Sequence, residues 1–321
     1  MYHDLWGALS AGFLLDLLFG SPEFLNLPEK WIRKLLSVLE SRLYKDDDDE
    51  KKKSLRGLQA MGALIASVVL IVAAVLLATY YVNRWLFIAV ESVMFWGILS
   101  VGSPGRAGIS IYRALKGDNT EDARAFFEAL SGQECFGFDR KRIISGTATY
   151  LSANTVLGAA APLFWMAVGG PAAGWLVKTL SILDRIAMRD RERYQVFGKT
   201  WAVFYDVVYY VPVRLGVLVM VAVSGFTGLD IKGAVKIYRR DRKKGERINS
   251  CRCESVCAGA LGIKLMGPSR YGDVIIESPF VGDSLRIPEN KDIKRSRGLM
   301  LETAFILYLI FSLCLFIISR T

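Results

Sequence analysis

Three ionisable side chains lie inside otherwise apolar stretches of the sequence: Asp16, Asp206 and Arg214. An ionised group at bilayer depth costs roughly 3 kcal/mol or more unless it is paired or hydrated. Asp206 and Arg214 are two helical turns apart, with Pro212 between them. For Asp206 and Arg214 the pattern favours a polar cleft that opens to the cytoplasm, whereas for Asp16, beside the helix-ending Gly20, it does not. The alternative is that each group reaches the membrane interface or pairs internally for packing.

A second set of reactive side chains, Cys251, Cys253 and Cys257, forms a C-x-C-x3-C cluster in a basic segment. Thiolates at this spacing bind soft metals, but a zinc site needs four ligands and the sequence has no second cluster of this kind. We therefore expect free thiols and no metal cluster, on a reducing cytosolic face. The sequence also lacks a G-x-x-x-x-G-K-[ST] loop, a G-x-S-x-G turn and a zinc-protease helix.

The elements that must position these groups are apolar helices. Of the 321 residues, 52% are hydrophobic, and they gather in long runs between short, strongly charged stretches. A helix that crosses a bilayer needs roughly 20 mostly apolar residues. We predict an all-α, polytopic integral membrane bundle with additional amphipathic helices, forming one membrane domain. Its predicted spans are 5–19, 58–80, 85–101, 148–168, 204–225 and 300–319.

The net charge of +10 bears on topology and partners. Lys and Arg concentrate in cytoplasmic loops, and the loops 20–57, 102–147 and 226–299 are basic. We therefore expect a multi-pass membrane protein with these loops in the cytoplasm. Basic side chains also contact anionic lipid, and no nucleic-acid-binding motif is visible, so the bilayer is the expected partner. The basic stretch 184–199 conflicts with six simple crossings unless the chain turns back near 170–183, so the crossing count there is open.

Motifs along the chain resemble, in order and spacing, those of the adenosylcobinamide-phosphate synthases, the CobD/CbiB family. Ala153–Gly158 with Ala161–Phe164 downstream is similar to the family's E-N-T-V-D-G and P-L-F motifs. The likeness runs from about residue 12 to 290. Further matches are Leu15–Leu17 with Gly20 and Pro22, Leu183-Asp184, Glu192–Tyr194 with Phe197-Gly198, Asp206 with Pro212 and Arg214, Asn249, Glu254 with Ala258–Gly262, Gly267-Pro268, Tyr271-Gly272, Pro279 and Gly282.

The resemblance implies an ATP- and magnesium-dependent ligase of cobalamin biosynthesis in the inner (cytoplasmic) membrane. Such an enzyme joins adenosylcobyric acid to an aminopropanol phosphate and gives adenosylcobinamide phosphate. Corrinoid and amino-alcohol phosphate substrates, ATP and Mg²⁺ are therefore expected, and a protein of the same pathway is a possible partner. Because an unactivated carboxylate does not condense with an amine in water, ATP must first convert it to an acyl phosphate. That step needs carboxylates to hold Mg²⁺ and basic groups to offset phosphate charge.

The resemblance also implies which residues form the site. Asp184, Asp206, Arg193 and Arg214 are the expected catalytic residues, with the aspartates as metal ligands and the arginines on phosphate. The expected substrate-binding residues are Asn154, Thr155, Glu192, Tyr194, Asn249, Glu254 and Tyr271. For Tyr194, a role in helix packing is an equal alternative to substrate binding.

The sequence departs from the family's pattern at several polar positions. The family's Glu in E-N-T is Ala153, its Asp in V-D-G is Leu157, and an earlier Glu is Thr149. One Asp of a D-D pair is Tyr205, and the following Asn is Tyr209. Losing a metal-binding carboxylate lowers the rate by orders of magnitude.

Two hypotheses follow from these departures. The first is a divergent ligase whose surviving polar residues carry the reaction. The second is a catalytically inactive relative that acts as a membrane scaffold or a ligand-binding sensor. A transporter is disfavoured by the large loops and the lack of an internal repeat. The sequence leaves open the exact amine substrate and the oligomeric state.

Overall fold

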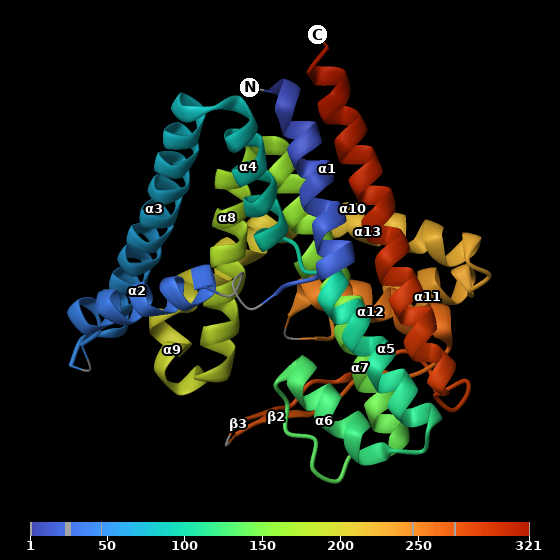
Figure 1. Ribbon diagram of the computed structural model, residues 1–321. Coiled ribbons are helices and arrows are strands. Elements are labelled where there is room, and N and C mark those ends of the chain that lie inside the picture. The colour runs from blue at the N-terminus through green and yellow to red at the C-terminus, as the bar shows by residue number, and fades with distance from the viewer. Residues whose placement is uncertain (1, 23–26, 46, 246, 273, 321) are drawn as a thin grey trace. The chain divides into compact units, whose positions relative to one another are not determined.

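The computed structural model describes residues 2–22, 27–45, 47–245, 247–272 and 274–320, and most of them are helical (Figure 1). Four helical segments are long and apolar enough to cross a membrane. The first is α3, the second is the continuous run Arg140–Arg189 that joins α7 to α8, and the other two are α10 and α13. The neighbouring helices α4 and α5 together make a fifth candidate, and α1 is a shorter apolar helix. These elements confirm the predicted all-α, polytopic membrane fold. The number of crossings and the side on which each loop lies stay predictions.

The chain divides into two compact units, and each combines segments that are distant in the sequence. Unit 1 consists of residues 1–99, 161–210 and 310–321. Its helices are α1 (Tyr2–Phe19), α2 (Leu27–Leu43), α3 (Glu50–Val82), α4 (Arg84–Ile98), α8 (Ala161–Arg189), α9 (Arg191–Phe197), the first part of α10 (Lys199–Phe226) and the end of α13 (Asn290–Ile318).

Unit 2 consists of residues 100–160 and 211–309. Its elements are α5 (Gly102–Lys116), α6 (Thr120–Ser131), α7 (Arg140–Asn154), a π-helical turn η2 (Thr155–Ala160), the rest of α10, α11 (Ile231–Asp241), α12 (Ile248–Leu261), the first part of α13, and the short strands β1 (Leu265–Met266), β2 (Ser269–Tyr271), β3 (Val274–Ile276) and β4 (Phe280–Val281).

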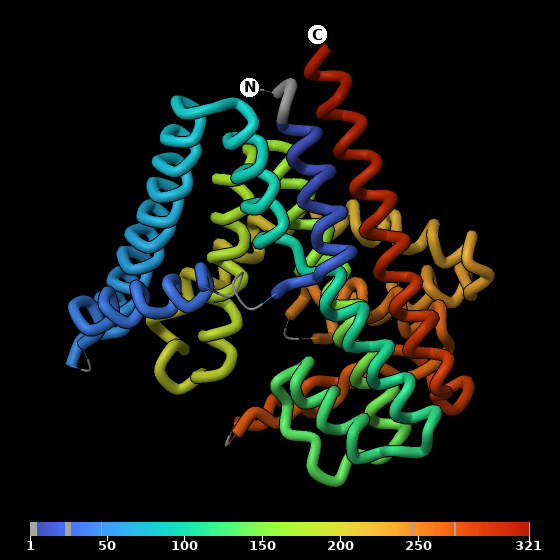
Figure 2. The backbone as a smooth tube through the Cα atoms, viewed as in Figure 1, coloured from blue at the N-terminus to red at the C-terminus, as the bar shows by residue number. Residues whose placement is uncertain are grey.

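In unit 1, α3 and α4 form a hairpin with a very short turn, which Figure 2 traces. Asn83 makes this turn by capping both helices. Its backbone N–H donates to the carbonyl of Thr79 at the end of α3, and its side-chain oxygen accepts from the N–H of Trp85 at the start of α4 (2.7 Å). A single residue therefore satisfies polar backbone groups on both sides of the turn, with its backbone on one side and its side chain on the other.

Helix α8 differs from the expectation that the span ends at Gly169-Gly170-Pro171. The backbone leaves the helical conformation only at the two glycines, and the helix continues from Pro171 to Arg189. Gly170 has a φ of 61°, which a residue with a Cβ rarely adopts. Pro171 is tolerated because the break has already removed the hydrogen bond that a proline cannot make. The result is one bent helix that carries polar residues in its second half.

Ser103-Pro104-Gly105 lies in the first turn of α5, where proline is favoured. The segment 226–299, predicted as a basic cytoplasmic loop, contains α11, α12 and two antiparallel strand pairs. Strand β1 pairs with β4, with Leu265 opposite Val281, and β2 pairs with β3, with Arg270 opposite Ile275.

Helix α12 forms the core of unit 2. It packs against α7 and α11 and contacts η2, β1 and β4. Every residue from Asn249 to Leu261 is buried, including Arg252 and Glu254. Helices α11 and α12 meet closely at two glycines, since a Cβ at Gly259 would lie 2.3 Å from the carbonyl oxygen of Gly233. Only glycine permits this approach.

Candidate functional site

The two predicted metal ligands lie near each other in unit 1. Asp184 is on α8 and is buried, whereas Asp206 is on α10 and is exposed. The two carboxylates interact electrostatically. The rings of Tyr205 and Tyr209, which replace polar residues of the family pattern, are both buried and stack with centroids 4.2 Å apart. The structure therefore brings together Asp184 and Asp206 from helices that are separate in the sequence.

This pair of carboxylates suits one kind of metal site and not another. Mg²⁺ is usually held by one or two carboxylates, with water and substrate phosphates completing its octahedron. Over the described ranges of the chain, no three His, Cys, Asp or Glu side chains gather in a group that could hold a metal ion. Asp184 and Asp206 thus fit an ion that arrives with a phosphorylated substrate, and they do not form an all-protein metal cage. The assignment of both residues as metal ligands stays a prediction.

A cluster of charges that sequence reasoning missed lies beside this pair in unit 1. Nη2 of Arg185 is 3.2 Å from Oε2 of Glu29, and Nη2 of Arg33 is 2.8 Å from Oε1 of the same carboxylate. Lys178 donates to the carbonyl of Ile98 (3.4 Å) and interacts electrostatically with Glu29, Arg185 and Asp16. The signal was present, since Lys178 and Arg185 are seven residues apart and so lie on one face of α8.

The charges of this cluster balance one another. Burial by itself raises the pKa of Glu29, but the positive charges of Arg185 and Arg33 outweigh burial and hold that pKa below its ordinary value. Glu29 is therefore ionised at neutral pH. A half-buried cation such as Lys178 needs nearby anions of this kind. Unit 1 accordingly contains a half-buried network of paired charges.

Arg193 and Tyr194, predicted for phosphate and substrate, share a partner on α2. The hydroxyl of Tyr194 donates to Oε1 of Glu40 (2.5 Å), and Nη2 of Arg193 is 3.6 Å from Oε2 of the same residue. The guanidinium of Arg193 also lies over the ring of Tyr44. Both side chains thus attach α9 to α2. Glu192, the third predicted residue of α9, is exposed.

In unit 2, Asn249 and Glu254 are both buried on α12. Oε2 of Glu254 has no hydrogen-bond partner among the residues that the structure describes. Burial raises the pKa of Glu254 to about 8, and the positive charge of Arg247 opposes this only in part. Glu254 is therefore mostly protonated at neutral pH.

Asn154 and Thr155 lie where α7 passes into the π-helical turn η2, and their recorded contacts are local to unit 2. The side-chain amide of Asn154 donates to the carbonyl of Ser100, and Oγ1 of Thr155 donates to the carbonyl of Leu151 (3.3 Å). Gly158 packs at the same place, since a Cβ there would lie 2.3 Å from the oxygen of Ser100. π-Helical turns are frequent at functional sites, which agrees with the motif that this turn carries.

The remaining predicted residues of unit 2 lie on other elements. Arg214 is half-buried in the second part of α10, and Tyr271 is half-buried at the end of β2. Their roles, and those of the other predicted site residues, stay predictions.

The three positions where the family's acids are replaced lie on α7 and η2. Oγ1 of Thr149 accepts a hydrogen bond from the backbone N–H of Met266 (2.9 Å) and donates to the carbonyl of Ser145 (2.8 Å). Ala153 and Leu157 are half-buried. Thr149 therefore joins α7 to β1, and its side chain has a structural role that an apolar residue could not fill.

The cysteines of the C-x-C-x3-C cluster are buried in α12 as free thiols. Burial raises the pKa of Cys251, Cys253 and Cys257 above the ordinary value. A thiol with a raised pKa is a poor nucleophile and a poor metal ligand, because only the thiolate reacts. The expectation that no metal cluster forms at these residues stays a prediction.

The apolar helices, together with buried ionisable groups such as Asp16 and Asp184, define a polytopic membrane protein with charged residues in its interior. The chain belongs to the CobD/Cbib protein family, because a sequence profile described as CobD/Cbib protein matches residues 9–300.

Individual relatives cover nearly the whole chain. It is 31% identical to the cobalamin biosynthesis protein CobD of Pelobacter propionicus, over 92% of this chain and 90% of that protein. It is 26% identical to the cobalamin biosynthesis protein CobD of Clostridium perfringens, over 92% of this chain and 93% of that protein. It is 29% identical to the cobalamin biosynthesis protein CbiB of Salmonella typhi, over 96% of this chain and 95% of that protein. No solved structure matches.

Proposed function

We propose that this protein acts in cobalamin biosynthesis as an ATP-dependent amide ligase that joins adenosylcobyric acid to an aminopropanol phosphate. The names of the relatives support the pathway, and the motif resemblance supports the reaction. The structural observation that carries the proposal is the approach of Asp184 and Asp206 from two helices of unit 1. Both residues occupy positions that match acidic residues of the family motifs.

The proposed reaction has two chemical steps. ATP phosphorylates the propionate carboxylate to an acyl phosphate and leaves as ADP. The deprotonated amine then attacks the acyl carbon, the amide bond forms and inorganic phosphate departs. Mg²⁺, when bound, neutralises phosphate charge. In this proposal Asp184 and Asp206 hold the ion, and the arginines Arg193 and Arg214 bind phosphate groups.

The polar interior of unit 1 supports this chemistry. Asp184 is buried, so its carboxylate lies where water is scarce and electrostatic interactions are strong. Asp206 is exposed and accessible to an incoming ion. The adjacent pair of Arg185 and Glu29 fixes the end of α8 on α2 and so holds Asp184 in position.

The proposal is tested on the full-length protein purified in detergent, supplied with adenosylcobyric acid, aminopropanol phosphate, ATP and Mg²⁺. We expect formation of adenosylcobinamide phosphate, and a loss of kcat of at least about 100-fold in Asp184→Asn and in Asp206→Asn. Asp47→Asn, at an exposed position of the α2–α3 connection, is the matched control and should leave kcat unchanged. Full activity in both site variants would exclude the two aspartates from the reaction.

One observation favours the second candidate, an inactive relative that binds a corrinoid or phosphorylated ligand. Thr149, where the family has an acid, is engaged in a structural hydrogen bond with β1, and Ala153 and Leu157 offer no oxygen ligand. Corrinoid binding with no ATP turnover, in the presence of both other substrates, would establish this candidate in place of the ligase.

A further inference from the structure

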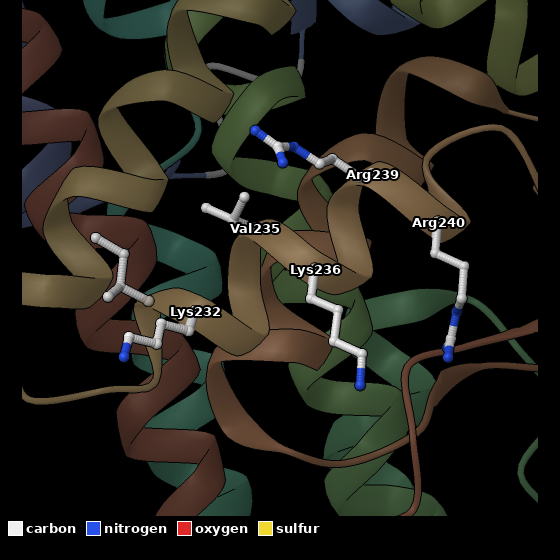
Figure 3. Close-up of a pocket in the computed structure, with 6 residues that line it drawn as sticks. Lys232, Val235, Lys236, Arg239 and Arg240 are labelled. Atoms are coloured by element: carbon white, nitrogen blue, oxygen red, sulfur yellow. The ribbon is translucent and has the colours of Figure 1, made fainter.

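Helix α11 of unit 2 carries an exposed basic face directly after a membrane-spanning candidate. Between Ile231 and Arg240 the sequence has four basic residues and no acidic one. An open, shallow hollow follows this face and is lined by Ile231, Lys232, Val235, Lys236, Arg239 and Arg240. Figure 3 shows Lys232, Lys236 and Arg240 extending to one side of the helix, whereas Arg239 extends to another side, together with Val235.

The opposite face of α11 is fixed to the protein. Ala234 and Ile237 are buried, and the glycine contact with α12 leaves no space between the two helices. The side chain of Asp230 caps the first turn by accepting from the N–H of Gly233 (2.9 Å). The basic face is therefore presented by a helix that is already folded and anchored.

Three of the four basic side chains are available for a partner. Arg240 is occupied, because its guanidinium binds Asp241 (2.8 Å) and Asp283 (2.7 Å). Lys232, Lys236 and Arg239 form no ion pair with another residue that the structure describes. Uncompensated positive charge on a folded helix favours an anionic partner.

The position of α11 in the chain indicates which anionic partner binds this basic face. Only residues 227–230 separate α11 from Phe226, the end of the membrane-spanning candidate α10. Phe226 is 88% exposed and Ile231 is 41% exposed, as expected of apolar side chains that enter lipid at the end of a span. Basic residues next to a span lie at the level of the phospholipid headgroups. We propose that Lys232, Lys236 and Arg239 form a docking surface for the anionic headgroups of the bilayer that α10 enters.

The test measures amide hydrogen exchange along α11 in the full-length protein. The protein is placed in nanodiscs of phosphatidylcholine alone, or of phosphatidylcholine with phosphatidylglycerol. Each basic side chain near an anionic surface favours the bound state by about fivefold. We therefore expect exchange in α11 to be slower by at least about tenfold with phosphatidylglycerol, and high salt to remove the difference.

Variants assign the effect to these side chains. A triple variant combines Lys232→Gln, Lys236→Gln and Arg239→Gln. The amides of its α11 should exchange at the same rate in both nanodiscs, and unchanged exchange in α12 shows that unit 2 is folded. The matched control replaces Lys51, Lys52 and Lys53, at the start of α3, by Gln and should keep the full difference.

Three results would overturn the proposal. One is equal exchange of the wild-type protein in both nanodiscs, and a second is loss of the difference in the Lys51–Lys53 control, which would indicate a general charge effect. The third is slower exchange on adding inorganic phosphate to phosphatidylcholine nanodiscs, which would assign the face to a soluble anion. None of these results depends on ligase activity.

Discussion

The hydroxyl of Tyr194 donates a hydrogen bond of 2.5 Å to the carboxylate of Glu40, which precedes it by 154 residues. The bond joins α9 to α2 in unit 1. Both side chains are buried, and the ring of Tyr194 also packs on Trp201 and Phe197. Burial, and then the hydrogen bond and charge of Glu40, raise the pKa of Tyr194 above its ordinary value. The raised pKa means that the folded protein favours the neutral phenol of Tyr194. The stabilisation by its hydrogen bond to Glu40 is therefore present at neutral pH and is lost only as the pH rises above about 10.

Tyr194→Phe should lower the free energy of unfolding by about 1.5–3 kcal/mol, because the buried carboxylate of Glu40 loses its hydrogen-bond donor. The measurement is thermal unfolding in one detergent near neutral pH. Tyr81→Phe, at a position that is 83% exposed, should leave Tm unchanged. If Tyr194→Phe instead raised the KM for a substrate and left Tm unchanged, Tyr194 would be a binding residue and not a structural one.

A steric prediction concerns the crossing of α3 and α9. A Cβ at Gly57 would lie 1.8 Å from the carbonyl oxygen of Phe197, and the carbonyl of Gly57 accepts from Nε1 of Trp201 (2.8 Å). Gly57→Ala must push the helices apart, and we expect a loss of at least about 1–3 kcal/mol. The matched control is Gly62→Ala on the same helix, where a Cβ meets nothing within 4 Å. That change should be neutral or stabilise by up to about 1 kcal/mol. Equal Tm values for the two variants would contradict the close crossing.

The apolar helices could be predicted from the sequence because length and composition suffice to define them. The runs 58–80 and 300–319 both correspond to long helices, α3 and α13. The continuation of α8 past Pro171 could not be predicted in this way, since Gly-Gly-Pro ends most helices. It depends on the positive φ of Gly170, which only the folded chain reveals.

The partners of the site residues were beyond the reach of sequence patterns. The chemistry of Asp184 and Asp206 was predicted from their types and their motif positions, and the structure places them near each other. Glu40, by contrast, lies on an amphipathic helix whose charges look solvated, and nothing in its spacing points to Tyr194. The burial of α12 was also missed. Its mixture of Arg, Glu and Cys has no apolar period, and tertiary packing on all sides overrides composition.

The buried carboxyl of Glu254 predicts a pH dependence of stability. Its pKa in the folded protein is about 8, against an ordinary value of 4.5. Between these values the folded protein keeps a proton that the unfolded chain releases. The stabilisation is therefore fully present below pH 4.5 and is lost as the pH rises through about 8.

Glu254→Gln cannot ionise at this position, so its free energy of unfolding should change less between pH 5 and 8 than that of the wild type. The two changes should differ by at most about 5 kcal/mol. Chemical unfolding across this range is the measurement. Glu277→Gln, which removes an exposed carboxyl group, should keep the wild-type slope. A wild-type slope in Glu254→Gln as well would show that Glu254 ionises normally in the folded state.

The replaced acid at position 149 gives the last prediction. Thr149→Val keeps the shape of the side chain but removes the acceptor for the N–H of Met266, so we expect a loss of about 1–3 kcal/mol. Thr149→Ser keeps the acceptor and should remain close to the wild type in Tm.

Thr149→Glu separates stability from chemistry, because a carboxylate can also accept from Met266 and restores the acid of the family pattern. If the protein is a divergent ligase, kcat should stay the same or fall in this variant, since its site has adapted to threonine. A gain in kcat would show that the lost acid limits the reaction and would support descent from an active ligase toward an inactive relative.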